Sequence, residues 1–219
     1  MGRTSDARAR LISATQRLVW EHGYAAASVD AICKAARVQK GSFYHFFPSK
    51  QALVAAALAA WGEGERGGLD ALFSPSRPPL ARLSAWFQAL EAQQRAARGR
   101  CGRALGCPLA TLGAEVAAEA PEVAEVVRAL MERLRRYVAS ALRDAQAEGL
   151  VRTDVDARDL AAALFTHLEG VLVQARIHDD PAVAARLESG ARLILGLPLP
   201  GAAPSRPPTR ARRPARERS

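Results

Sequence analysis

The chain has 219 residues and a net charge of +9, and 49% of it is hydrophobic although only 5% is aromatic. Its three cysteines lack metal-ligand spacing, which argues against a disulfide framework and a zinc site. No apolar run approaches the roughly 20 residues that span a bilayer, and neither a secretory leader nor a myristoylation pattern is found. We therefore expect a cytoplasmic protein with no membrane contact, metal or cofactor.

The composition also predicts the fold class. Alanine supplies much of the hydrophobic content, and β-branched runs bounded by turns are missing, which favours an all-α protein. The charge is uneven: residues 1–60 hold 8 basic against 3 acidic side chains (+5), residues 61–199 hold 17 against 18 (−1), and residues 200–219 hold 6 against 1 (+5). Basic ends on a neutral middle suit binding to nucleic acid.

The N-terminal part predicts a three-helix unit over residues 1–48. An apolar helix ends at Gly23, and Ser28 stands in the N-cap position of a second, short helix. A turn of about three residues joins it to a third helix, which Pro48 and Ser49 end. Two short helices with a tight turn between them predict a helix-turn-helix, whose second helix enters the DNA major groove.

Residues 49–197 are expected to form a helical domain for ligand binding and dimerisation. Apolar spacing and caps predict helices over 49–61, running into the glycine-rich stretch 62–68, and over 80–98, 107–118, 121–148, 157–177 and 181–195. Gly149 is the expected C-cap of the helix over 121–148, and Asp156 is the expected N-cap of the next helix. With the first three, this makes about nine helices. Residues 198–219, rich in proline and arginine, are predicted to be a basic disordered tail.

The order hydrophobic-x-x-x-Ala-x-Val-x-x-Gly-Ser-Phe-Tyr-x-x-Phe-x-Ser-Lys, from Ile32 to Lys50, resembles the DNA-binding domain of TetR/AcrR-type transcriptional regulators. The resemblance covers roughly residues 4 to 60. Arg37 stands where this family usually has glycine, so we expect a small strain or a shifted turn there. The segment Gly106-Cys107-Pro-Leu-Ala-x-Leu-x-x-Glu115 is similar to one TetR-type subgroup, in the helix that links the head to the body.

Five residues near the start of the third helix are candidates to read DNA. Gln39, Lys40, Gly41 and Ser42 occupy the end of a recognition helix whose side chains meet base edges. Gln39 can pair with adenine and Lys40 with guanine, while Gly41 lets the backbone approach the DNA closely. His45 lies about one turn beyond Gly41, and it faces either the groove or only solvent.

Three further residues are candidates for phosphate contacts. The resemblance implies this role for Tyr44 and for Lys50, which also stands beside a helix N-terminus. Ser28 offers its hydroxyl or amide to another phosphate, or serves only as a cap. Phe43 and Phe47 are predicted to be core residues of the head.

A homodimer is expected, because one head spans only a few base pairs and specific binding requires two heads on a palindromic operator. The resemblance implies the same. The two C-terminal helices have apolar stripes and small residues at 161–163 and 184–185, which suit a four-helix bundle across a two-fold axis. The alternative is that these stripes pack only within one subunit.

The resemblance further implies a repressor that a small-molecule effector releases from DNA. Its pocket is expected among the middle helices, and the candidates to line it are Trp86, Phe87, Cys107, Leu130, Leu164 and His167; residues of this kind are more often simple core. A neutral body without a charged cluster favours an apolar or weakly polar effector. The operator, the regulated genes and the choice between repressor and activator are not determined by these residues.

Cys107 has a sharper hypothesis, because it stands near a predicted helix start where the dipole favours a thiolate. An electrophile or oxidant would then react with it and release the DNA; the alternative is a small buried hydrophobe.

Two other functions of the protein stay open. One is an architectural protein that binds any DNA sequence through its basic ends. The other is an enzyme with Cys107 as nucleophile and His167 or His178 as base, although no motif orients them.

Overall fold

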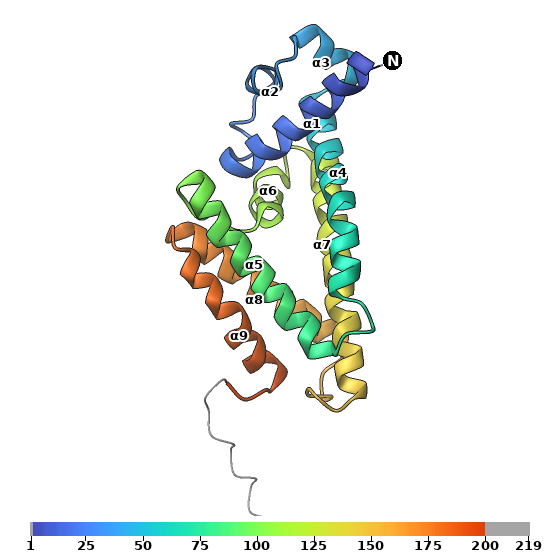
Figure 1. The fold of residues 1–219 in the computed structure, drawn as a ribbon, viewed down its shortest axis with the longest axis vertical. Helices are drawn as coiled ribbons and strands as arrows, with labels where there is room; N and C mark the ends of the chain where they lie inside the picture. Colours follow the sequence, from blue (N-terminus) through green and yellow to red (C-terminus); the bar gives the residue numbers. More distant parts are fainter. Residues whose placement is uncertain (1, 200–219) are drawn as a thin grey trace, which may run out of the picture.

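The computed structural model describes residues 2–199, and every regular element within that range is helical, which confirms the all-α prediction (Figure 1). The predicted count of about nine helices is also confirmed for these residues. The elements are α1 (Gly2–His22), α2 (Val29–Ala36), α3 (Lys40–Phe46), α4 (Lys50–Leu72), α5 (Pro79–Cys101), α6 (Pro108–Val116), α7 (Pro121–Ala147), α8 (Ala157–Ile177), the 3₁₀ helix η1 (Pro181–Ala185) and α9 (Arg186–Leu195). The predicted tail lies outside the described residues from position 200 onward.

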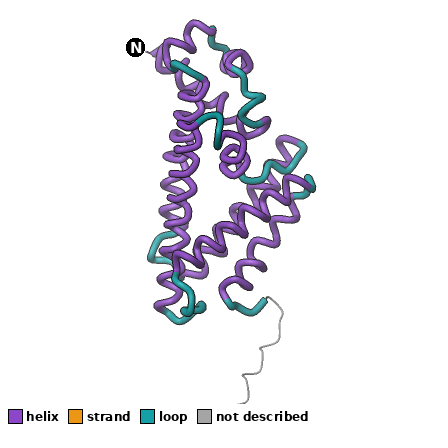
Figure 2. Tube along the Cα trace, turned by 180° about the vertical axis from the view of Figure 1, so that it is seen from behind, coloured by secondary structure: helices purple, strands orange, loops and turns teal. Residues whose placement is uncertain are grey.

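The helices divide into a head and a body. The head contains α1, α2 and α3 at one end of the molecule, and α6 lies between it and the body (Figure 1). Helices α4 and α7 run side by side along one edge, while α5 and α8 cross the molecule on the other side (Figures 1 and 2). Because α4 begins directly after the helix-turn-helix and continues deep into the body, it connects the two parts.

The predicted caps form as expected at most helix ends. Ser28 Oγ accepts a hydrogen bond from the Ala31 amide at 3.1 Å, and Asp156 Oδ1 accepts one from the Arg158 amide at 2.7 Å. Gly149 follows the end of α7 with a left-handed φ of 69°, as a C-terminal cap requires. The last helix differs, because Pro181 opens η1 and the α-helix itself begins only at Arg186.

Two hydrophobic cores share α7. Its N-terminal half, with Val123, Val127 and Leu130, packs with the head and α6. Its C-terminal half, with Val138 and Leu142, packs with α5, α8 and α9. The two cores are therefore joined by one continuous helix of 27 residues.

The glycine-rich stretch 62–68 is helical throughout and belongs to α4. At Gly62 the two long helices approach closely, since a Cβ there would collide with the side chains of Leu130 and Arg133. Arg133 also donates a hydrogen bond to the Gly62 carbonyl and pairs with Glu63 at 3.1 Å. Gly62 therefore allows the contact that fixes α4 to α7.

One expectation about apolar runs was wrong. Helix α8 is long and apolar enough to meet the composition of a membrane span, with a mean hydropathy of 1.2. Its leucines at 160, 164, 168 and 172 are buried in the body core, however. A core helix of a soluble protein meets the same criterion, so this finding does not indicate a membrane protein.

Candidate nucleic-acid interface

Aromatic burial orients the recognition helix α3. Phe43 is fully buried and Phe47 is only 4% exposed, and both belong to the head core with Ile32, as predicted. Phe43 lies within α3 and Phe47 is the C-cap residue directly after it, so the two anchor the inward side of α3. Phe46 packs partly against the same core, and the exposed residues of α3 lie on the remaining surface.

The outward face contains the residues that were predicted to read DNA. Gln39, Lys40, Ser42 and His45 are exposed, and nothing lies within 4 Å of the position that a Cβ on Gly41 would take. The structure therefore places this set together on one open, polar surface. Tyr44 is 55% exposed although its ring makes an edge contact with Phe43 at 5.0 Å, so its hydroxyl lies at the surface.

Two lysines of the interface already have partners within the head. Lys40 Nζ pairs with Asp30 at 2.9 Å, and the hydrogen bond to Asp30 raises the pKa of Lys40. Lys50 Nζ donates to the Tyr24 carbonyl at 2.8 Å and lies 3.7 Å from the centre of the Tyr24 ring. Desolvation lowers the pKa of Lys50. Each lysine must leave its partner, or share it, to contact DNA.

The turn before α3 has the predicted strain. Arg37 adopts a left-handed conformation with φ of 54° and ψ of 47°, which costs a residue with a side chain about 1–2 kcal/mol. Arg10 of α1 lies against this turn, and its Nη1 donates to the carbonyls of Ala36 and Arg37 at 3.2 and 3.3 Å. Sequence reasoning missed Arg10, because no local pattern connects residues 26 positions apart.

Glu115 of α6 ties the head to the body. Its carboxylate accepts hydrogen bonds from the amides of Tyr24 and Ala25, at 2.7 and 2.6 Å, in the loop between α1 and α2. Gly23 has a φ of 86°, and a Cβ there would lie 2.9 Å from Glu115 Oε2. Glu115, the last residue of the segment 106–115 that resembles the TetR-type subgroup, therefore holds the α1–α2 loop of the head against α6.

Cys107 is the N-cap of α6, but its surroundings oppose a thiolate. Its Sγ accepts a weak hydrogen bond from the Ala110 amide and donates one to Glu169 Oε1, both at 3.5 Å. Burial of the thiol group, followed by the charge of Glu169, raises the pKa of Cys107 to about 12. The expectation of a dipole-stabilised thiolate was therefore wrong, since desolvation outweighs the backbone amides.

The histidines considered as catalytic bases do not contact Cys107. His167 Nε2 faces the carbonyls of Arg186 and Leu187 at 3.3 Å, and His178 Nε2 lies 3.1 Å from Gln174 Oε1. The geometry shows no activated nucleophile at this position. Within residues 2–199, no group of three His, Cys, Asp or Glu side chains is placed to hold a metal, and all three cysteines are free thiols.

The six pocket candidates occupy different surroundings. Trp86, Phe87 and Leu164 pack together in the body core, with the two aromatic rings 5.9 Å apart. Leu130 belongs to the core shared with the head, and Cys107 borders both cores. His167 is partly buried beside α9. Their role in ligand binding remains a prediction.

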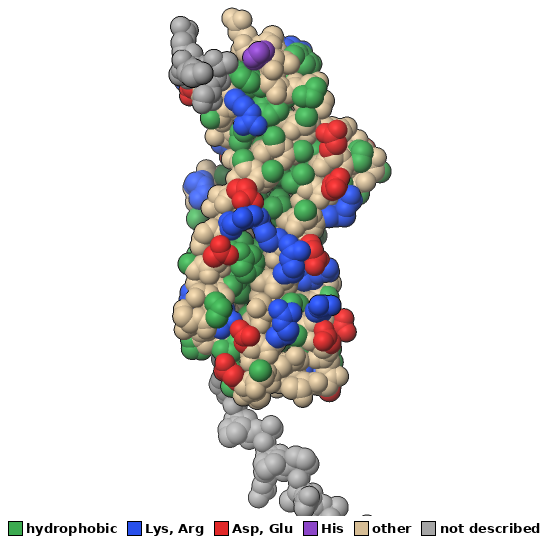
Figure 3. Space-filling view, turned by 90° about the vertical axis from the view of Figure 1, so that its right-hand side faces the viewer, with side chains coloured by type: hydrophobic (Ala, Val, Ile, Leu, Met, Phe, Trp, Pro, Cys, Tyr) green, Lys and Arg blue, Asp and Glu red, His purple; other side chains and the backbone are tan. Residues whose placement is uncertain are grey.

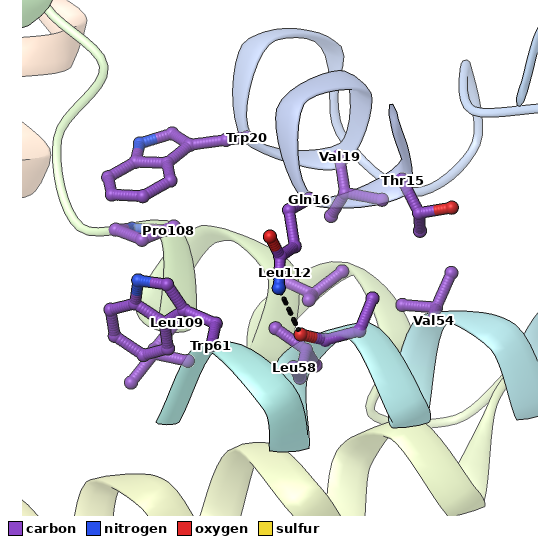
Figure 4. Close-up of a pocket in the computed structure, with 11 residues that line it drawn as sticks. Thr15, Gln16, Val19, Trp20, Val54, Leu58, Trp61, Pro108, Leu109 and Leu112 are labelled. Atoms are coloured by element: carbon purple, nitrogen blue, oxygen red, sulfur yellow. Dashed lines mark hydrogen bonds between the residues drawn. The ribbon is translucent and has the colours of Figure 1, made fainter. Parts of the chain in front are cut away.

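A small apolar cavity lies elsewhere, where α1, α4 and α6 meet (Figure 4). Trp20 and Trp61 form an edge contact at 6.2 Å on one side of it, and Gln16 Nε2 donates to the Ala57 carbonyl at 2.8 Å. Its volume of about 30 Å³ is too small for an organic effector.

An exposed recognition helix on a small helical head, joined to a larger helical body, defines a two-domain helix-turn-helix regulator. Residues 11–57 match the family model for bacterial regulatory proteins of the tetR family, and residues 79–190 match the model for the tetracyclin repressor-like C-terminal domain. The chain belongs to the TetR family of transcriptional regulators.

Individual relatives agree with this assignment. The transcriptional regulator AcuR of Cereibacter sphaeroides is 34% identical over 178 residues, which cover 81% of this chain and 80% of AcuR. The regulator UidR of Escherichia coli K12 is 27% identical over 192 residues, 86% of this chain and 91% of UidR. A crystal structure of a regulatory protein TetR from Rhodobacter sphaeroides has a TM-score of 0.75 and 32% identity, covering 84% of this chain and 96% of that one.

The strained turn predicts that Arg37→Gly raises the free energy of unfolding by up to about 1 kcal/mol, because glycine adopts positive φ without a steric cost. Urea unfolding followed by circular dichroism measures the change. Lys34→Gly, three residues earlier within α2, is the matched control and should lower stability by about 1 kcal/mol. Equal destabilisation by both variants would contradict a strained turn.

The raised pKa of Cys107 predicts slow alkylation. Iodoacetamide should modify Cys107 more slowly than Cys101, the other partly buried cysteine, at pH 7.5, and the rate at Cys107 should still be rising at pH 10, below its pKa of about 12. Glu169→Gln removes a charge that raises this pKa, so it should speed the reaction. Mass spectrometry of the alkylated peptides measures both rates, and faster modification of Cys107 than of Cys101 would restore the sensor hypothesis.

Proposed function

We propose that this regulator is a dimeric repressor that binds a palindromic operator and is released by a small-molecule effector. The observation that carries the proposal is the two-sided recognition helix, with Phe43 and Phe47 buried on one side and an open polar row from Gln39 to Ser42 on the other. Such a helix is held rigidly while its outer face is free to enter a major groove.

In this proposal the head residues divide their tasks. Gln39, Lys40, Ser42 and His45 contact base edges, and Gly41 allows the backbone to approach closely. Tyr44, Lys50 and Ser28 contact phosphates on either side. The Asp30 carboxylate next to Lys40 increases the discrimination between guanine and the other bases. Only a strong acceptor such as guanine draws the ammonium group of Lys40 away from this carboxylate.

Exposed apolar side chains on α8 and α9 support the dimer. Ile177 is 67% exposed, Leu193 is 64% exposed and Val173 is 36% exposed, whereas the opposite faces of these helices are buried in the body. Apolar side chains exposed on two neighbouring helices suit a two-fold helical interface. A second copy of the chain would cover them.

The connections of the head support release by an effector. Glu115 and the α4–α7 contact at Gly62 join the head to the body, so a change in the body alters the placement of the recognition helix. A non-covalent effector is the better supported form, because the enclosed thiol of Cys107 is poorly suited to react with electrophiles. A cytoplasmic location fits a regulator of this family.

Two other functions are less supported. A purely architectural DNA-binding protein needs no open row of base-reading side chains, and it predicts equal binding to all DNA sequences. A cysteine enzyme needs an oriented base, whereas the thiol of Cys107 faces the carboxyl group of Glu169. The relatives described above are transcriptional regulators.

The DNA contacts are tested with fluorescently labelled DNA from upstream of the gene itself and with random DNA, at ~0.15 M salt. Gln39→Ala should weaken cognate binding by about 5- to 150-fold with little effect on random DNA. Tyr44→Phe should weaken both by a similar, smaller factor. Gln93→Ala on α5 is the control. Equal affinity of the unaltered protein for both DNAs would favour the architectural alternative.

The dimer is tested by sedimentation velocity. Ile177→Glu and Leu193→Glu should convert the protein to monomers of 23.4 kDa, because a carboxylate would be buried in the apolar interface. Leu150→Glu places the same charge at an exposed leucine outside α8 and α9, and it should leave the dimer intact. Monomers of the unaltered chain at micromolar concentration would overturn the dimeric proposal.

A further inference from the structure

A groove between α7 and α8 is lined by arginines. It consists of two adjoining hollows of about 450 and 410 Å³, which share Glu132 and Arg135. The arginines that line it are Arg128, Arg135, Arg136, Arg143 and Arg158. Hollows of this size fall within the range of small-molecule sites.

The positive charge of the groove is largely unpaired. Five arginines face two acidic residues, Glu132 and Asp159, which leaves +3 on the groove, whereas residues 61–199 as a whole carry −1. Of these five arginines, only Arg135 has an ion pair within residues 2–199, with Glu132. The guanidinium groups of the other four make no ion pair or hydrogen bond within this part of the chain. Positive charge is therefore concentrated here and left available.

Apolar side chains also line the groove. Met131 and Phe165 line one hollow, and Ala139 and Ala162 line the other. An occupant that fits both kinds of lining has an anionic group for the guanidinium groups and an apolar body for the apolar side chains. Guanidinium groups bind carboxylates through paired hydrogen bonds, which makes arginine well suited to this task.

The position of the groove argues against DNA as its occupant. Helix α7 runs from the head down the body (Figure 1). Its residues that line the groove, from Arg128 to Arg143, belong to its middle and C-terminal part. Figure 3 shows lysine and arginine side chains gathered on the body below the head, with acidic side chains between them. DNA held by α3 lies beyond the opposite end of the molecule.

We propose that this groove binds a small organic carboxylate with an apolar body, and that this molecule is the effector. The inference rests on the proposed function and differs from the expectation of an apolar or weakly polar effector. That expectation followed from the neutral total charge of the body, which conceals the local concentration of arginine along α7.

The groove has a direct connection to the head. An anion that bridges α7 and α8 changes the distance between these helices. Arg133 of α7, next to Glu132 of the groove, binds the Gly62 carbonyl and Glu63 of α4. Because Gly62 leaves no space at this contact, α4 must follow α7. Since α4 starts at Lys50, directly after the recognition helix, a shift in the groove alters the spacing of the two heads.

Calorimetry on the full chain with three probes tests the binding. Decanoate combines the carboxylate with an apolar body, decan-1-ol has the body alone, and inorganic phosphate has only the charge. Decanoate should bind at least about tenfold more tightly than either control, and added salt should weaken it. Equal binding of decan-1-ol and decanoate, or no binding of decanoate, would overturn the proposal.

Charge-matched double variants locate the site. Arg136→Gln with Arg143→Gln should weaken decanoate binding at least about tenfold and abolish its release of DNA. Arg100→Gln with Arg186→Gln removes the same charge from exposed positions outside the groove, and it should preserve both. An equal response of the two double variants would show a general charge effect and overturn the proposed site.

Two further readouts separate this proposal from the proposed function. If the protein binds its operator specifically but decanoate neither binds nor releases it, the groove proposal fails alone. If specific DNA binding is absent, the proposed function fails. Sedimentation of the Arg136→Gln, Arg143→Gln variant should show an intact dimer; its dissociation would show that a second copy occupies the groove and would overturn the effector site.

Discussion

Burial of Val123, Val127 and Leu130 on one half of α7, and of Val138 and Leu142 on the other, makes this helix common to both hydrophobic cores. The head and the body therefore cannot change their packing independently. The close approach of α4 at Gly62 adds a second constraint, because it leaves no space in which one helix could slide past the other without moving side chains. In the proposed function, close packing of this kind would transmit a small change in the body to the DNA-binding surface.

A small number of contacts also places the recognition surface. Phe43 and Phe47 orient α3 by burial, while Arg10 supports the left-handed turn that precedes it. Glu115 holds the loop that also supplies the Tyr24 carbonyl to Lys50. Lys50 and Glu115 thus act on neighbouring groups of one loop, from α4 and α6 respectively. The placement of the phosphate-contact candidates and the attachment of the head to the body are consequently linked through Tyr24.

The basic side chains of the head and of the body have different electrostatic surroundings. At the head, Lys40 is paired with Asp30, so the proposed contact of Lys40 with DNA requires an exchange of partners, which would favour selectivity over raw affinity. On the body, the arginines of the α7–α8 groove have few acidic neighbours and are open to an anion. Cys107 shows the opposite situation, because burial beside Glu169 keeps its thiol protonated. An exposed thiol at the same helix start would have a lower pKa, because the helix dipole would then favour the thiolate without the cost of desolvation.

The sequence by itself determined the all-α class, the helix-turn-helix, most caps and the core role of Phe43 and Phe47, because these depend on residues within a few turns of one another. It also indicated a positive φ or a shifted turn at Arg37. Only the tertiary structure showed the Arg10 brace, the Lys50–Tyr24 contact, the protonated thiol of Cys107 and the arginine groove. Each of these joins side chains that are distant in the chain, and their energies depend on burial and on neighbouring charges, which no local pattern contains.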